Sequence, residues 1–129
     1  MKAVRVNEID NFDKQVQEAV NKSSSVYVVF FGTETPETSE SWCPDCVVAD
    51  PLIRKAILTH APSDAILLEA PVGLRGDWKG NTSHPYRTRK DFDLPAIPTL
   101  YKWSKEGPGA RLVEAECADA ALLESFIKA

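Results

Sequence analysis

Two cysteines, Cys43 and Cys46, stand three positions apart in the segment Ser-Trp-Cys-Pro-Asp-Cys. This C-x-x-C spacing allows a thiolate to attack a disulfide and form a mixed disulfide, which the second thiol then resolves. The same spacing occurs in zinc sites, but a zinc ion needs about four ligands. The other candidate ligands are scattered along the chain, at His60, His84 and Cys117. The sequence therefore favours redox chemistry, and we expect no bound metal.

The position of the two cysteines along the chain also favours this chemistry. They follow an apolar stretch and open a helical one, which places Cys43 at an exposed helix start. Unpaired backbone N–H groups and the positive end of the helix dipole stabilise a thiolate there. We expect Cys46, about one turn into the helix, to be more buried. Cys117 is interpreted as an unreactive, partly buried residue.

Three segments have the pattern of strands in the first half of the chain. Residues 26–31 (VYVVFF) are continuously apolar and rich in β-branched and aromatic side chains, which is typical of a central strand covered on both faces. Residues 65–70 predict a second buried strand, and the alternation at 2–6 predicts a short edge strand. Between the predicted strands 26–31 and 65–70 we expect a helix from about Cys43 to about His60. It should end there because Pro62 prevents its continuation.

The remaining segments complete an alternating pattern. Asp10 can cap a helix that places Phe12, Val16 and Val20 on one face. The long polar stretch 73–90 is expected to hold a short helix near its end. Residues 99–103 and 111–115 flank Lys-Glu-Gly-Pro-Gly and predict a hairpin. An amphipathic helix over 118–128 should close the chain, with four apolar side chains inward: Leu122, Leu123, Phe126 and Ile127.

The predicted order is β-α-β-α-β-(α)-β-β-α, an α/β fold whose central mixed sheet carries helices on both faces. With 129 residues, 43% of them hydrophobic, the chain fits one domain over 1–129 that needs no stabilising disulfide. The net charge of −4 gives no general attraction to nucleic acid or to an anionic membrane. The start of the chain has no secretory pattern and no apolar run is long enough to span a bilayer, so we expect a cytoplasmic protein.

Several motifs together resemble a known family. Trp-Cys-x-x-Cys before a helix, Pro51 five positions after the second cysteine, and Ile-Pro-Thr at 97–99 before a hairpin are similar to thioredoxin. Pro44-Asp45 between the cysteines resembles the 14-kDa thioredoxin-related proteins, also called the Clot or thioredoxin domain-containing 17 family. The long loop before Trp42, Val-Gly at 72–73 with Trp-Lys at 78–79, and residues 112–117 extend the likeness over nearly the whole chain.

The resemblance implies a thioredoxin-like fold in which Cys43 is the nucleophile and Cys46 the resolving thiol. It also implies that Pro44 and Asp45 set the redox potential. The implied activity is the cytosolic reduction of small disulfides such as cystine, or of peptide disulfides, through a reversible Cys43–Cys46 disulfide. No cofactor would be bound, because electrons would come from NADPH through thioredoxin reductase. The protein is expected to be a monomer.

The resemblance further implies a substrate groove formed by Trp42, Ile97 and Pro98. Pro98 would be the cis-proline that faces the active-site sulfurs, although its position alone predicts the commoner trans bond. Trp78 either lines the same groove or merely anchors its loop. The nearby basic residues Arg87, Arg89 and Lys90 are interpreted as a solvated face offset by Asp91 and Asp93.

Two departures from thioredoxin carry further expectations. Phe30 aligns with the buried aspartate that helps proton transfer at the resolving cysteine, so Asp45 or water would have to replace it. The loop 32–41 is several residues longer than in thioredoxin. We expect it to narrow access to Cys43 and, through Glu34, Glu37 and Glu40, to disfavour acidic substrates, or else to be a passive insertion.

Two other functions remain open. A glutaredoxin-like reductase would use glutathione, but it usually lacks the tryptophan before the first cysteine and has a Gly-Gly pair that Gly-Pro-Gly at 107–109 matches poorly. A non-enzymatic thioredoxin-fold binding module would use its cysteines to sense oxidation. Such modules often lose one cysteine, whereas both are present here.

Overall fold

The computed structural model describes residues 1–129. Its five strands form one mixed sheet in the order β1-β3-β2-β4-β5. The neighbouring strands β1, β3 and β2 are parallel to one another. Strand β4 is antiparallel to β2, and β5 is antiparallel to β4. The strands are β1 (Lys2–Arg5), β2 (Val26–Phe31), β3 (Ile66–Pro71), β4 (Thr99–Ser104) and β5 (Gly107–Val113). The predicted thioredoxin-like α/β fold and its order of elements are confirmed.

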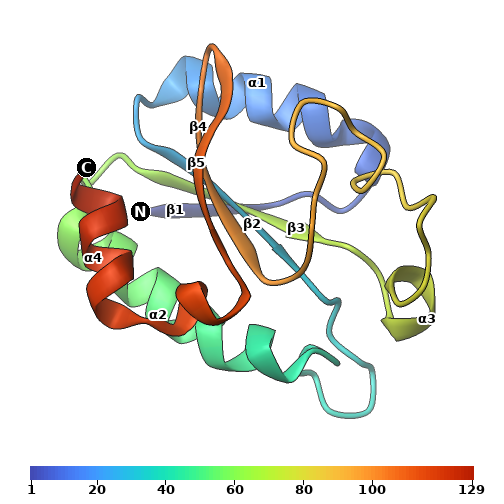
Figure 1. Cartoon of the computed structure of the whole chain (residues 1–129). Coiled ribbons are helices and arrows are strands. Elements are labelled where there is room, and N and C mark those ends of the chain that lie inside the picture. Colours follow the sequence, from blue (N-terminus) through green and yellow to red (C-terminus); the bar gives the residue numbers. More distant parts are fainter.

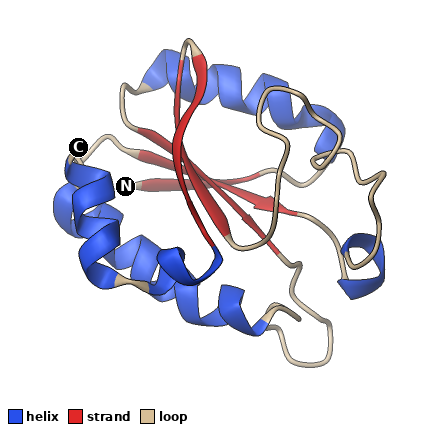
Figure 2. Cartoon of the chain, viewed as in Figure 1, coloured by secondary structure: helices blue, strands red, loops and turns tan.

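Helices cover both faces of this sheet (Figures 1 and 2). Helix α1 (Phe12–Lys22) packs on one face through the predicted Phe12, Val16 and Val20. Helices α2 (Pro44–His60) and α4 (Ala120–Lys128) cover the other face. None of the helices combines the length and the apolar character that crossing a bilayer requires.

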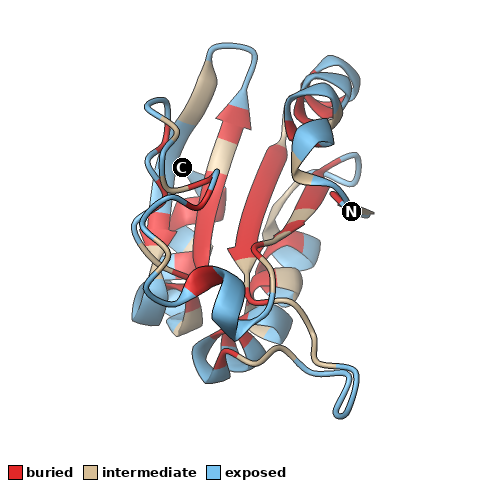
Figure 3. Ribbon diagram, turned by 90° about the vertical axis from the view of Figure 1, so that its right-hand side faces the viewer, coloured by how far each residue is buried: buried red, intermediate tan, exposed pale blue.

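Strand β2 lies at the centre of the sheet, and its residues 26–30 are all buried (Figure 3). Its continuous apolar sequence is explained by the helical layers on both of its faces. The strand ends at Phe31, and after the loop 32–43 the chain enters α2. The central strand and a long helix packed on it therefore hold the two ends of the segment that carries the cysteines.

Two predictions about helices were wrong in detail. Asp10 does not cap α1, because residues Ile9–Asn11 form a 3-10 turn and Asn11 occupies the capping position without a side-chain bond. The short helix of the polar stretch is α3 (Arg75–Trp78), at its start rather than its end. There Gly73 turns the chain at a φ of 109°, and the Asp77 carboxylate accepts the backbone N–H of Leu74.

The last segments also differ from the prediction. The second hairpin strand begins at Gly107 and ends at Val113, after which residues Glu114–Ala118 form a 3-10 helix instead of more strand. Helix α4 starts at Ala120, because the Asp119 carboxylate accepts two backbone N–H groups of its first turn. Leu122 is 41% exposed, contrary to the prediction, while the other three predicted side chains, Leu123, Phe126 and Ile127, are buried.

Candidate functional site

The local sequence fixes Cys43 at the first position before α2. Its backbone is extended (φ −93°, ψ 108°), and Pro44 occupies the first helical position, where its missing N–H costs nothing. The Ser41 hydroxyl accepts the Cys43 backbone N–H at 3.2 Å. A bridge between Glu34 and Ser41 closes the preceding loop. The predicted helix start is confirmed, and the thiol of Cys43 lies where the helix amides are unpaired.

Hydrogen bonds to the Cys43 sulfur lower its pKa. The Cys46 thiol makes the largest contribution, and the Cys46 backbone N–H adds a bond of 3.3 Å. Burial and the Asp45 carboxylate oppose these effects, and the resulting pKa of Cys43 is about 7, down from an ordinary 9.0. About half of the Cys43 side chain is therefore thiolate at neutral pH.

Cys46 has the opposite electrostatics. Its hydrogen bond to Cys43 and its burial raise the pKa of the Cys46 thiol far above the ordinary range. Hydrogen bonds with the Ser41 side chain and the Gly32 backbone act the other way, because they favour a Cys46 thiolate. All three cysteines are free thiols. In the reduced pair, the protonated Cys46 thiol therefore donates a hydrogen bond to the Cys43 thiolate.

Cys43 and Cys46 differ less in exposure than expected. Cys43 is only 6% exposed, against 3% for Cys46, and it packs in an apolar cluster with Trp78 and Ile97. Cys117 is fully buried, and burial raises the pKa of its thiol to about 12. No group of three or more His, Cys, Asp or Glu side chains is placed to share a metal ion.

A groove lies directly in front of Cys43. Trp42 and Ile97 line it, together with Pro44, Asp45 and Trp78, whereas Pro98, the third residue predicted for a substrate groove, does not. Trp42 is held by its Nε1–H, which donates to the Gly73 carbonyl at 2.8 Å. Its indole lies close to Gly32, where an added Cβ would be 2.7 Å from Cε2. Gly32 therefore permits the close approach that seats the indole beside Cys43.

Pro98 follows a cis peptide bond, in agreement with the resemblance and not with the commoner isomer. It lines a second cavity together with Cys46, whereas its neighbour Ile97 lines the groove of Cys43. Cys117 donates its thiol to the Leu112 carbonyl at 3.2 Å, below this segment. The loop 95–98 thus contributes Pro95, Ala96 and Ile97 to the groove of Cys43 and Pro98 to the cavity of Cys46.

Trp78 both lines the groove and anchors its loop. It is 4% exposed, and the Arg87 guanidinium stacks over its ring at 3.6 Å and donates to its carbonyl at 3.1 Å. Arg87 is therefore not part of a solvated face, while Arg89 pairs with Asp13 and Asp91 as a surface residue would. The sequence reasoning missed Arg75 and Lys79, two further cations of this groove.

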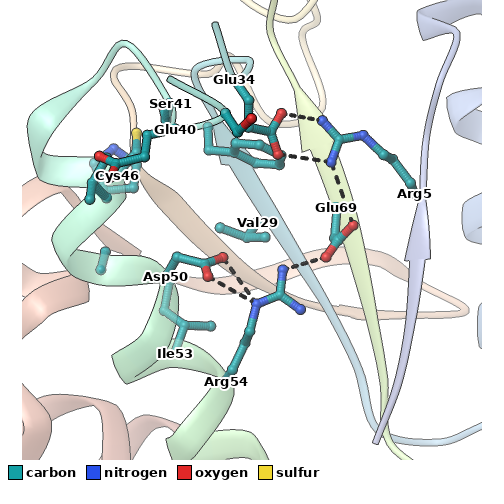
Figure 4. Close-up of a pocket in the computed structure, with 15 residues that line it drawn as sticks. Arg5, Val29, Glu34, Glu40, Ser41, Cys46, Asp50, Ile53, Arg54 and Glu69 are labelled. Atoms are coloured by element: carbon teal, nitrogen blue, oxygen red, sulfur yellow. Dashed lines mark hydrogen bonds and ion pairs between the residues drawn. The ribbon is translucent and has the colours of Figure 1, made fainter. Parts of the chain in front are cut away.

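The cavity behind Cys46 contains an ion-pair network that the sequence did not predict (Figure 4). Its members come from β1, the loop, β3 and α2, so no local motif brings them together. Arg5 pairs with Glu34 at 2.6 Å and Arg54 with Asp50 at 3.1 Å, and both arginines also pair with Glu69. The bond from Arg5 lowers the pKa of Glu34.

This placement does not support the expected effect of the loop glutamates. Glu34 is neutralised by Arg5, and both Glu34 and Glu40 line the cavity behind Cys46 rather than the groove of Cys43. The residues of β2 that line this cavity are Val29 and Phe31, on either side of the expected Phe30, because successive strand side chains point to opposite faces. Phe30 instead packs against the rings of Phe12 and Tyr86.

Comparison with known proteins agrees with this geometry. The thioredoxin domain of the thioredoxin domain-containing protein 17-like family matches residues 5–129. Mouse thioredoxin domain-containing protein 17 is 35% identical over 121 residues, which cover 94% of this chain and 90% of the relative. The thioredoxin-like protein Clot of Arabidopsis thaliana is 36% identical over 92 residues, 71% of this chain and 67% of that protein.

Solved structures show the same fold. Schistosoma mansoni thioredoxin superposes with a TM-score of 0.64 at 20% identity, covering 98% of this chain and 94% of that one. Thioredoxin O2 of Arabidopsis thaliana gives 0.66 at 16% identity, with coverages of 98% and 92%. The family supports a thiol oxidoreductase activity of the thioredoxin type. The chain belongs to the thioredoxin domain-containing protein 17-like family.

Proposed function

We propose that residues 1–129 act as one monomeric domain that reduces small-molecule or peptide disulfides in the cytosol, with Cys43 as nucleophile and Cys46 as resolving thiol. The observation that carries this proposal is the asymmetry of the pair. Hydrogen bonds from Cys46 lower the pKa of Cys43 to about 7, and the same contact keeps Cys46 protonated. Cys43 is thus ionised and able to attack a disulfide, while Cys46 stays protonated until the second step.

The first step forms a mixed disulfide. The Cys43 thiolate attacks one sulfur of R–S–S–R, a bond forms between that sulfur and Cys43, and R–S⁻ leaves and takes a proton from solvent. In the second step the Cys46 thiol gives its proton to water, its sulfur attacks the Cys43 sulfur, and the bond between Cys43 and the substrate sulfur breaks. The second R–S⁻ departs and is protonated, so two electrons pass to the substrate and the protein is left with a Cys43–Cys46 disulfide.

The structure suggests why Cys46 becomes reactive only after the first step. The Cys43 thiolate is the main reason for the high pKa of Cys46, and that negative charge disappears when Cys43 is in the mixed disulfide. The hydrogen bonds with Ser41 and Gly32 remain, and both favour the Cys46 thiolate. Neither group is a base, so water accepts the Cys46 proton in place of the buried acid of thioredoxin, and the two bonds stabilise the thiolate that forms. Asp45 lines the groove of Cys43 instead.

The residues around the pair have supporting roles in this proposal. Pro44 fixes the helix start, and the Asp45 carboxylate raises the pKa of Cys43 against the effect of Cys46. Both therefore tune the redox potential of the pair. Trp42 and Ile97 line the groove in which a substrate disulfide lies in front of Cys43, and Pro98 lines the cavity on the Cys46 side of the pair.

We further propose that NADPH supplies the electrons through thioredoxin reductase, which reduces the Cys43–Cys46 disulfide after each turnover. The test is NADPH consumption with thioredoxin reductase, this protein, and either cystine or insulin. We expect turnover with cystine and little with insulin. Cys43→Ser should abolish it, and the buried control Cys117→Ser should retain it. Turnover that appears only with glutathione and glutathione reductase would make the protein glutaredoxin-like, and no turnover with any donor would favour an oxidation sensor.

A further inference from the structure

Three cations in the groove beside Cys43 have no acidic partner. Arg75, Lys79 and Arg87 line this groove, and none of them forms an ion pair. Three other arginines, Arg5, Arg54 and Arg89, each pair with two carboxylates. In a chain with a net charge of −4, unpaired cations gathered beside the reactive thiol are unusual enough to ask what they bind.

Cations outnumber carboxylates in the lining of the groove. Besides Cys43, its charged side chains are these three cations and two carboxylates, Asp45 and Glu114, so their charge is 3 − 2 = +1, which is the charge that remains once the Cys43 thiolate has formed a mixed disulfide. The groove also has apolar lining, because Trp42 and Ile97 line it together with Cys43. The site therefore contains an apolar surface for the carbon chain of a ligand and a thiolate that can attack its disulfide. Its cations can attract a negatively charged group further along the ligand.

Arg87 is held in place before any ligand arrives. Its guanidinium stacks on Trp78 at 3.6 Å, and one of its nitrogens donates to the Trp78 carbonyl. Less rotational freedom is lost when a fixed guanidinium binds a carboxylate than when a free one does. Arg75 and Lys79 flank Trp78 on α3 and just after it, at the end of the sheet where α2 begins (Figure 1).

We propose that Arg75, Lys79 and Arg87 form a carboxylate-binding subsite, which selects small disulfides that carry a negatively charged group a few bonds from the sulfur. This inference rests on the proposed disulfide reduction and names its preferred substrate class. It reverses the preference expected from the loop glutamates, which lie on the other side of the cysteine pair. The covalent steps are those given above, and the subsite only orients and concentrates the disulfide.

The test compares three disulfides of similar length and different charge: 3,3′-dithiodipropionate (anionic), hydroxyethyl disulfide (neutral) and cystamine (cationic). Reduced protein is mixed with each probe, and oxidation is followed by tryptophan fluorescence in stopped flow. Each rate is divided by the rate of the same probe with a small neutral thiol, which removes differences in intrinsic reactivity. The parent protein should favour the anion over the cation, and added salt should shrink the ratio, because charges are screened beyond about 8–10 Å.

The variants Arg75→Gln and Lys79→Gln are the informative ones, because both side chains are exposed and their loss leaves the Trp78 stack intact. Each should lower the relative rate of the anion about two- to threefold, as expected for one charge several ångströms away in water. Lys105→Gln, a matched loss of one positive charge at the far tip of the hairpin, should leave all ratios unchanged. The relative rates of Arg87→Gln are interpreted only if circular dichroism shows that this variant keeps its fold.

The outcomes separate the two proposals. If none of the probes is reduced, the proposed function is wrong. If all three are reduced but their corrected rates are equal, or the groove variants behave like Lys105→Gln, the subsite is wrong while the reductase function stands. A preference for the cation would also overturn the subsite.

Discussion

The hydrogen bond from the Cys46 thiol has a measurable consequence for Cys43. In the Cys46→Ala variant the largest effect that lowers the pKa of Cys43 is lost, while burial and the Asp45 carboxylate still oppose ionisation. In Cys46→Ser a hydroxyl donor remains at the same place. We therefore expect the alanine variant to raise the pKa of Cys43 and the serine variant to leave it close to about 7.

The size of the change follows from the energy of such a bond. A hydrogen bond to a charged group contributes about 1.5–3 kcal/mol, which corresponds to about 1–2 pKa units. The alanine variant should therefore titrate about 1–2 units higher than the parent. At pH 7 a thiol with a pKa of 9.0 is about 1% thiolate, whereas Cys43 is about half thiolate. The fraction of thiolate at pH 7 is thus roughly 50-fold higher for Cys43. A less basic thiolate is also less nucleophilic, by about eightfold for this difference in pKa, so part of the gain in rate is lost.

The assay is alkylation by iodoacetamide between pH 5 and 10, with the labelled cysteine identified by peptide mass spectrometry. In the parent, Cys43 labelling should rise as the pH passes through about 7 and then level off, because only the thiolate reacts. Each pH unit below the midpoint should slow it about tenfold. Equal midpoints in the alanine and serine variants, or a parent midpoint near 9, would refute the role given to the Cys46 thiol.

Three further predictions concern the surroundings of the pair. Gly32→Ala should destabilise the protein by about 1–3 kcal/mol in urea unfolding and alter tryptophan fluorescence, because the new methyl group collides with the Trp42 indole; unchanged stability would contradict that packing. Ser41→Ala should slow the resolution of a mixed disulfide about two- to tenfold in stopped flow, because a bond that favours the Cys46 thiolate is lost; an unaffected second step would exclude this role. Cys117 should resist iodoacetamide at pH 8 until urea unfolds the chain, since its thiol is fully buried with a pKa raised to about 12, and labelling of the native protein at this residue would contradict the fold around it.

Much of the fold could be predicted because its elements depend on local patterns. The apolar run of β2 and the stop at Pro62 define a central strand and the end of a long helix, and both agree with the structure. Errors occurred where a short polar segment decides the geometry. The Asp119 cap, for example, starts α4 at Ala120, two positions later than predicted.

The site could be predicted only as far as the motif extends. Cys43 and Cys46 are neighbours on the chain, so their spacing revealed their relation. The degree of burial of Cys43 depends on distant residues such as Ile97, which no local pattern connects to it. The cations of the groove were missed for the same reason, since Arg75 and Arg87 approach Cys43 only through the loop that Trp78 anchors.

The alternation of strand side chains explains a further error. A shift of one position in aligning β2 exchanged Phe30, which faces the aromatic cluster, for Val29, which lines the cavity of Cys46. Either residue is apolar, so the absence of a buried acid on this strand was inferred correctly from the wrong position. The bonds from Ser41 and Gly32 to Cys46 depend on the path of the loop and were not visible in the sequence.

The central claim is that Cys43 attacks a disulfide and Cys46 resolves the product. The most direct measurement is the intact mass of Cys46→Ser protein after reaction with cystine, followed by peptide mapping. The account predicts one half-cystine adduct on Cys43, stable until a thiol is added, and no lasting adduct on the parent protein, which should instead form the Cys43–Cys46 disulfide. An adduct on Cys117, or a Cys46→Ser protein that releases its adduct as fast as the parent without added thiol, would contradict it.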